Sequence, residues 1–80
     1  LFIQLLYTMK KIKKIKIKLN GKIKSIIKDC KLSELLKHHK IPIKKVAIEL
    51  NKEIIDKKNI KKINLKKNDI IEIVHFIGGG

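Results

Sequence analysis

The sequence closes with Lys67-Asn68-Asp69-Ile70-Ile71-Glu72-Ile73-Val74-His75-Phe76-Ile77-Gly78-Gly79-Gly80: a turn, an apolar run and three glycines. Residues 70–77 are apolar except at two positions, which is typical of a central strand buried on both faces. The strand leads directly into glycines, which have no Cβ and let backbone approach where other residues would clash. Taken alone, three closing glycines also fit an inert chain end. Their meaning therefore depends on the rest of the chain.

Upstream, lysine alternates with isoleucine or leucine. This period of two predicts a strand with an apolar face and a lysine face, formed by Ile15, Ile17 and Leu19 against Lys14, Lys16 and Lys18. Asn20-Gly21 predicts a hairpin turn into a second strand over residues 22–27. A plain two-residue turn would pair Ile17 with Lys24, whereas a glycine bulge pairs Ile17 with Ile23 and keeps the faces consistent. The sequence therefore predicts a glycine-bulge hairpin.

The middle of the chain predicts one helix and further strands. A helical spacing connects Leu32, Leu35, Leu36 and His39, and Pro42 stops the helix. Lys31 is a poor N-cap and Ser33 or Asp29 are the alternatives, so the helix start is weakly marked. Strands are predicted over residues 46–50 and 53–55, followed by a polar connection with Ile60 and Ile63 turned inward. This order indicates an α+β fold, with a mixed sheet of four to five strands and one main helix packed across one face.

Length and charge limit the classes of function. Eighty residues form one small domain, which leaves little room for an internal active site. The net charge of +14 suggests nucleic-acid binding, yet all 21 basic residues are lysine and none is the arginine that reads guanine and clamps phosphate. Lysine and isoleucine together make 39 of the 80 residues, a composition that AT-rich codons also explain. We therefore interpret the lysines as a solvated face.

Thiol and imidazole groups are few. Cys30 is the only cysteine, so the chain forms no internal disulfide, and this suits a reducing cytosol. His38 and His39 would point about 100° apart on a helix, and His75 lies on the last predicted strand. No CxxC motif is present, so no metal site is predicted.

The first residues differ from the rest. Residues 1–7 form an apolar run that is too short to span a bilayer and lacks the basic flank of a secretory signal. Because Met9 follows this run, residues 1–8 are interpreted as an extraneous or disordered segment. The predicted boundaries are then 9–77 for a single folded domain and 78–80 for a flexible glycine tail. No membrane association is expected.

Four segments together resemble the ubiquitin-like sulfur carriers, whose fold is a β-grasp. They are Ile17-Lys18-Leu19-Asn20-Gly21-Lys22, Leu32-Ser33-Glu34-Leu35-Leu36, Val46-Ala47-Ile48-Glu49-Leu50-Asn51-Lys52-Glu53-Ile54-Ile55 and the closing block quoted above. The resemblance is closest to the ThiS branch of thiamine biosynthesis and runs from about residue 14 onward. The closing block is its most specific part, whereas Lys31 and Lys52 depart from residues that are common in the family.

The resemblance implies a carrier rather than an enzyme. The Gly80 carboxylate would be adenylated by a ThiF-like adenylyltransferase with ATP and Mg²⁺, and a sulfur donor enzyme would convert it to a thiocarboxylate, 1-thioglycine. A ThiG-like thiazole synthase would then take the sulfur for the thiazole ring of thiamine. The partner would contact Phe76, Ile77, Gly78 and Gly79. For Phe76, a position in the core and a contact with the partner are equally expected. The carrier itself would hold no stable cofactor and no metal, in the cytoplasm or the equivalent stroma or matrix of an organelle.

Other functions use the same features. A MoaD-like small subunit of molybdopterin synthase shares the fold, the tail and the activation, and differs in the sulfur acceptor. A protein modifier, or a carrier for another acceptor such as tRNA, would also use Gly80. A lysine-rich nucleic-acid-binding module would bind in a salt-sensitive way that does not need the tail.

Overall fold

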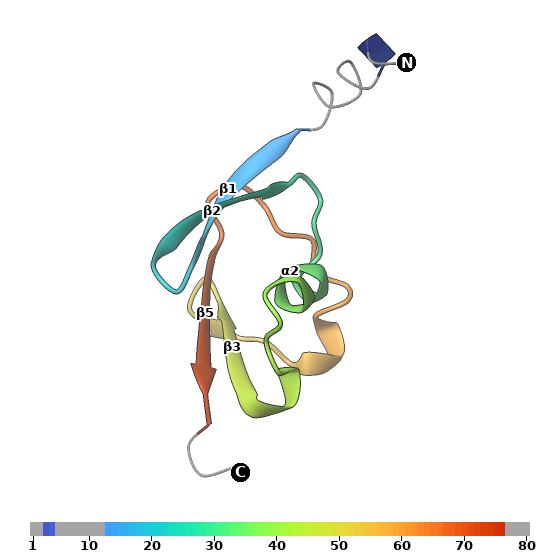
Figure 1. Cartoon of the computed structure of the whole chain (residues 1–80). Helices are drawn as coiled ribbons and strands as arrows, with labels where there is room; N and C mark the ends of the chain where they lie inside the picture. The colour runs from blue at the N-terminus through green and yellow to red at the C-terminus, as the bar shows by residue number, and fades with distance from the viewer. Residues whose placement is uncertain (1–2, 5–12, 77–80) are drawn as a thin grey trace.

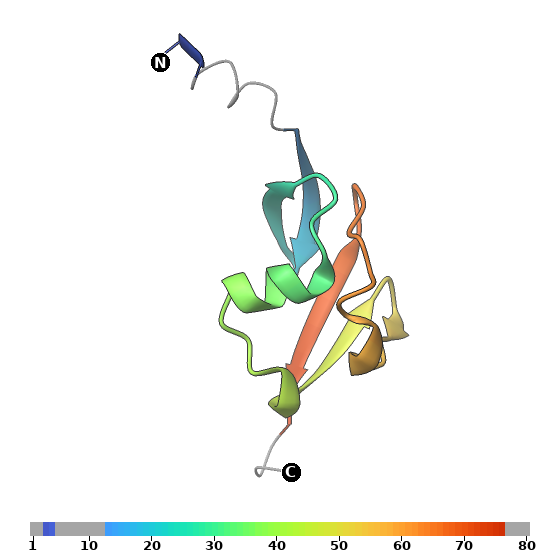
Figure 2. The same cartoon turned by 90° about the vertical axis from the view of Figure 1, so that its right-hand side faces the viewer.

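The computed structural model describes residues 3–4 and 13–76. Five strands form one mixed sheet in the order β2-β1-β5-β3-β4, and a single main helix, α2, covers one face (Figure 1, Figure 2). The elements are β1 Lys14–Leu19, β2 Lys22–Ile27, α2 Leu32–His38, β3 Val46–Leu50, β4 Glu53–Ile54 and β5 Ile70–His75, with short 3-10 turns η1 Ile43–Lys45 and η2 Lys57–Asn59. The predicted α+β arrangement, a β-grasp, is confirmed. The predicted boundaries at 8–9 and 77–78 fall among residues that the structure does not describe.

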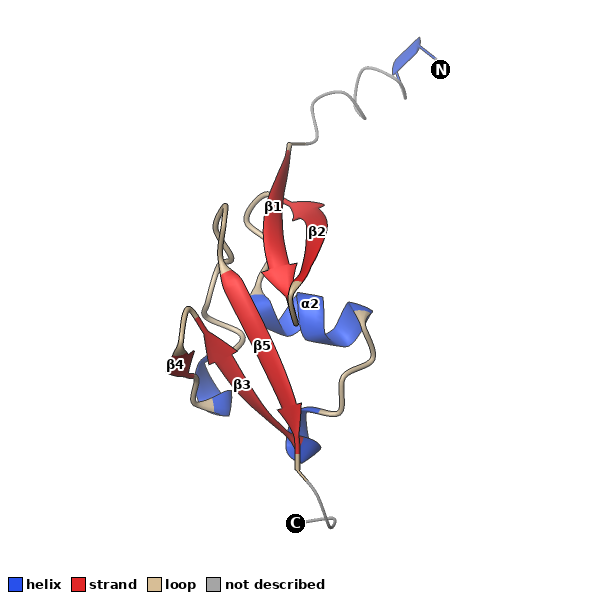
Figure 3. Ribbon diagram, turned by 90° about the vertical axis from the view of Figure 1, so that its left-hand side faces the viewer, coloured by secondary structure: helices blue, strands red, loops and turns tan. Residues whose placement is uncertain are grey.

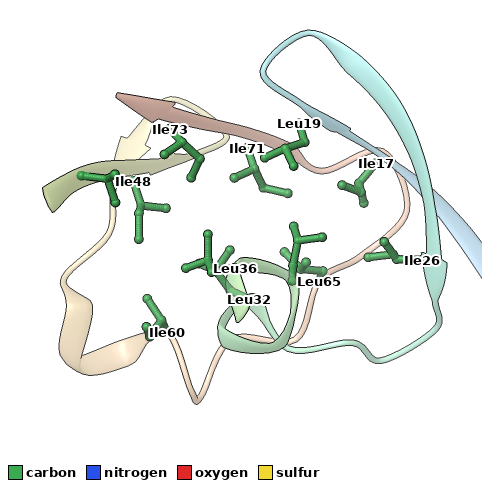
Figure 4. Packing of buried hydrophobic residues seen from close by; sticks show 12 residues of the cluster. Ile17, Leu19, Ile26, Leu32, Leu36, Ile48, Ile60, Leu65, Ile71 and Ile73 are labelled. Carbon is green, nitrogen blue, oxygen red and sulfur yellow. The ribbon is translucent and has the colours of Figure 1, made fainter. Parts of the chain in front are cut away.

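The core lies between the sheet and α2 (Figure 4). Its buried side chains are all apolar: Ile17, Leu19, Ile26, Leu32, Leu35, Leu36, Val46, Ile48, Ile60, Leu65, Ile71 and Ile73. Leu32 and Leu36 project from the helix toward the sheet, while Ile60 and Leu65 come from the long connection before β5. Because no described polar side chain is buried, burial of isoleucine and leucine is the main force that holds the sheet to the helix.

Strand β5 is the centre of the sheet but is covered on only one side. β1 runs parallel to it and β3 antiparallel, with Val46 opposite His75. Ile71 and Ile73 are buried, whereas Ile70 is 38% and Val74 56% exposed. The prediction of a strand buried on both faces is therefore wrong. One helix covers one face, and nothing among the described residues covers the other (Figure 3).

The β1–β2 hairpin has a simple two-residue turn, so the predicted glycine bulge is also wrong. Ile17 pairs with Lys24, and Asn20 and Gly21 have φ angles of +50° and +81°, the left-handed pair of a type I′ turn. This register is tolerated because β2 is an edge strand, where Lys24 is only partly buried and its long side chain can reach solvent. Ile23, which was predicted to face the core, is 66% exposed.

The helix and the later strands follow the sequence pattern closely. Leu32, Leu35 and Leu36 form the buried stripe of α2, but His39 is the exposed C-cap and its predicted place in the stripe is wrong, because the helix ends at His38. In the connection that follows β4, Ile60 is buried and Ile63 packs partly against the core, as predicted.

Candidate functional site

The end of β5 determines where the chain leaves the fold. The backbone N–H of Phe76 donates to the carbonyl of Lys45 at 2.9 Å, which extends the contact between β5 and β3 one residue beyond the strand. The exit point therefore lies beside η1, at the end of the sheet opposite to the first residues of β1 (Figure 1, Figure 3). The predicted site residues Ile77, Gly78, Gly79 and Gly80 lie outside the described residues.

Two turn asparagines hold β5 from both sides. Asn20 Oδ1 accepts a hydrogen bond from the Ile73 N–H at 2.7 Å, and Asn51 Oδ1 accepts one from the Ile70 N–H at 2.9 Å. The backbone N–H groups of the same asparagines donate to the carbonyls of Ile71 and Ile70. The Asn20 bonds satisfy backbone groups of β5 beyond its short pairing with β1, and the Asn51 bonds satisfy those beyond the end of its pairing with β3. The glycine segment therefore follows a strand that both neighbouring turns hold in place.

Phe76 lies at the surface beside this exit. Its side chain is 47% exposed and is not part of the core cluster. Lys57 Nζ lies 5.3 Å from the centroid of the ring, within the range of a cation–π contact. Of the two places considered for Phe76, core and partner surface, the structure puts it at the surface.

A row of exposed apolar side chains leads along β5 to Phe76. We call the uncovered side of the sheet around this row the open face, formed by Ile54, Ile70, Glu72, Val74 and Phe76. The sequence analysis missed Ile70 and Val74 as site residues because it expected both faces of β5 to be buried. Glu72 is the sequence signal that could have revealed this face, because it lies two residues from both Ile70 and Val74 and so on the same side of β5. In the structure it is paired across the sheet with Glu49. Two carboxylates directly opposite each other indicate a solvent-facing side.

Cys30, His38 and His39 lie away from this exit, near β2 and α2, whereas His75 ends β5 directly before Phe76. Burial raises the pKa of the Cys30 thiol above its ordinary value, and Glu34 raises it further, so the thiol is protonated at neutral pH. The pKa of His39 is lowered by burial, with His38 and Lys24 adding to the effect. Among the described residues, no group of three or more His, Cys, Asp or Glu side chains is placed to hold a metal ion.

No helix in residues 3–4 and 13–76 is both long and apolar enough to cross a membrane.

A mixed sheet packed against one main helix, with a central strand followed in the sequence by glycines, is the arrangement of a small β-grasp carrier. A model of the ThiS family matches residues 17–80. The chain is 43% identical over 65 residues to the sulfur carrier protein ThiS of Bacillus subtilis, which covers 80% of this chain and 98% of that protein. A crystal structure of the thiamine biosynthesis protein ThiS from Geobacter metallireducens is similar with a TM-score of 0.73 at 28% identity, covering 82% of this chain and all of that one.

The chain belongs to the ThiS family and is a sulfur carrier of thiamine biosynthesis. It is also 38% identical over 65 residues to a thiazole synthase of Magnetococcus marinus. That match covers 81% of this chain but 20% of the synthase, so the carrier-like stretch is a small part of the larger protein. These relationships favour thiamine over molybdopterin as the pathway that the carrier serves.

Proposed function

We propose that Gly80 is the point of sulfur attachment. A ThiF-like adenylyltransferase joins AMP from ATP to the Gly80 carboxylate and releases pyrophosphate, with Mg²⁺ bound by the enzyme. Adenylation makes the carboxyl carbon electrophilic and supplies AMP as a leaving group, so a sulfur donor enzyme can form the thiocarboxylate, 1-thioglycine. The observation that carries this proposal is that the family match runs to Gly80, beyond a strand that hydrogen bonds hold through Phe76.

The carrier acts as a co-substrate in this scheme. Its contribution is a carboxylate on a slim glycine segment, which can pass a narrow opening because glycine has no Cβ. Phe76 and Ile77 form the base of that segment, and Gly78 and Gly79 the part that enters the partner. We assign the acid–base groups and the metal to the partner enzymes and no stable cofactor to the carrier. Since activation consumes ATP and reduced sulfur, we place it in the cytoplasm or in the stroma or matrix of an organelle.

The open face supports docking of the partners. Ile70, Val74 and Phe76 expose apolar surface that leads directly to the chain exit, and a folded protein that leaves such a patch uncovered usually binds something there. A ThiF-like adenylyltransferase and a ThiG-like thiazole synthase would use this face in turn. The M. marinus thiazole synthase supports the second partner, because it contains a stretch similar to this carrier.

Intact mass spectrometry tests the proposal. The full chain is incubated with ATP, Mg²⁺, a ThiF-like adenylyltransferase shown to be active on its own carrier, and a sulfide source. We expect a mass increase equal to the exchange of one oxygen for sulfur, located at Gly80 by fragmentation. A chain with one residue added after Gly80 should gain nothing, because the new carboxylate is displaced from the reacting position. Sulfur on that extended chain, or on another residue of the original one, would contradict the assignment.

A further inference from the structure

A groove separates edge strand β2 from helix α2. It encloses about 800 Å³, and Ile26 and Leu35 lie among its lining residues. Lys14, Lys24, Lys28 and His39 also line it. Acidic groups enter only near Cys30, where Asp29 and Glu34 contribute. The groove is therefore apolar in part and has more lysines than carboxylates on its rim. The elements that line it, β2 and α2, lie away from the end of β5 (Figure 1).

The edge of β2 next to this groove carries unpaired backbone groups. The two-residue turn makes Leu19 and Lys22 a hydrogen-bonded pair, and antiparallel strands alternate such pairs with pairs that face outward. The bond from the Lys28 N–H to the Lys13 carbonyl, at 2.9 Å, shows the same alternation at the other end of the hairpin. The N–H and C=O groups of Ile23 and Ser25 therefore point away from β1, toward the free edge of the sheet.

Charge decides what can pair with this edge. A free strand edge is a template for another strand, and lysines beside it oppose pairing with a second copy of the same basic chain. Two copies at +14 repel each other, so self-association through β2 is disfavoured. Lys14, Lys24 and Lys28 line the groove against Asp29 and Glu34, so lysines outnumber carboxylates there. An occupant with carboxylates would meet complementary charge.

We propose that β2 and the β2–α2 groove bind an extended, acidic segment of a partner protein by strand addition. The segment would exchange backbone hydrogen bonds with Ile23 and Ser25, place one apolar side chain against Ile26 and Leu35, and direct its carboxylates to Lys24 and Lys28. Backbone pairing supplies affinity and the alternate side chains supply selectivity. Because this surface is separate from the exit at Phe76, a partner could hold the carrier here while Gly80 is in use elsewhere. The proposal does not depend on the chemistry assigned to Gly80.

The probe is a short blocked peptide of alternating valine and threonine that ends in glutamates, added to the isotope-labelled full chain. We expect amide shifts in the NMR spectrum centred on Ile23 and Ser25, and binding that weakens as salt is raised. The same peptide ending in lysines should not bind. Ser25→Pro should weaken binding about tenfold, because it removes an outward N–H. Proline is tolerated at an edge position whose N–H faces solvent, so the spectrum should show an intact fold.

Two further variants keep the test decisive. Ser25→Val retains the backbone donor and should bind as the original chain does, while Lys24→Glu reverses one rim charge without touching the backbone and should weaken binding. Absence of shifts, shifts centred on the open face, or full binding by both Ser25→Pro and Lys24→Glu would overturn the proposal. So would equally tight binding of a peptide made only of glutamate, or of an oligouridylate, at the same amides, because that would be general attraction for polyanions.

Discussion

At the scale of single residues, the two turn asparagines explain how β5 is held. Asn20 and Asn51 both have positive φ angles, which asparagine tolerates better than most residues. Each also accepts a hydrogen bond from a β5 backbone N–H through its side-chain oxygen. One residue type thus serves the turn and the neighbouring strand, and the strand that leads to the glycines depends on both turns.

Replacing Asn20 tests this. In Asn20→Gly the Ile73 N–H loses its acceptor in a partly buried setting while the positive φ angle stays allowed, and we expect the free energy of unfolding to fall by about 1–3 kcal/mol. Asn20→Asp keeps an acceptor oxygen and the tolerance of positive φ, so it should retain most of the stability. Urea unfolding of the two variants side by side measures the difference. Equal losses would show that the side-chain oxygen contributes nothing.

Cys30 gives a pH dependence with a defined sign. Burial raises the pKa of this thiol above its ordinary value, so the unfolded chain ionises first as the pH rises. The folded state then binds more protons than the unfolded state, and stability falls with increasing pH above about 9, through the folded pKa. Below that range the contribution is constant. Between about pH 8 and about pH 10, where a thiol titrates, we expect the original chain to lose more stability than Cys30→Ala. Parallel losses in urea unfolding would contradict this.

At the scale of elements, α2 begins where the sequence shows no good cap. Lys31 makes no side-chain capping bond. Instead, the N–H groups of Leu32 and Ser33 donate to the carbonyls of Ile63 and Ile60, at 2.9 and 3.0 Å. The first helical donors are thus satisfied by the connection before β5, which is distant in sequence. Local signals could not reveal this cap because the groups that form it are about thirty residues away.

Adding a side-chain cap should therefore have little effect. Lys31→Ser introduces a favoured N-cap residue, which commonly stabilises a helix by about 1 kcal/mol. Here the donors it would satisfy already have partners. The substitution also removes the exposed hydrogen bond from Lys31 Nζ to Asn64 Oδ1, so we expect no gain and a loss of no more than about 1 kcal/mol. Thermal and urea unfolding provide the measurement, with Lys37→Ser as a control on the same helix. A gain near the usual value would show that the carbonyls of residues 60 and 63 do not serve as the cap.

At the scale of the whole molecule, one helix on one side of five strands leaves the other side to solvent. Ile70, Val74 and Phe76 are exposed for this reason, in a row that ends where the chain leaves the sheet. Within residues 3–4 and 13–76 there is no second layer to cover them. The same arrangement that limits the core therefore provides the apolar open face next to the glycine segment.

Val74→Lys tests the open face. Val74 is 56% exposed, so the substitution should change the free energy of unfolding by no more than about 1 kcal/mol. If partners dock on this face, a lysine there would lose apolar contact and have to be desolvated, and we expect thiocarboxylate formation to slow about tenfold or more. Ile27→Lys is the matched control, because Ile27 is similarly exposed, at 57%, but lies on β2, away from the exit. Equal rates for both variants would place docking elsewhere.

The sequence by itself determined the number and kind of elements, the apolar face of β1, the stripe of α2 and the glycines that follow β5. These features are local, since alternation, helical spacing and the Asn-Gly hairpin signal are all visible within a few residues. Only the tertiary structure decided the β1–β2 register, the cap of α2 and which side of β5 is open. Each of these depends on where the one helix packs and how far it reaches, and that position follows from the burial of the whole apolar set rather than from any single segment.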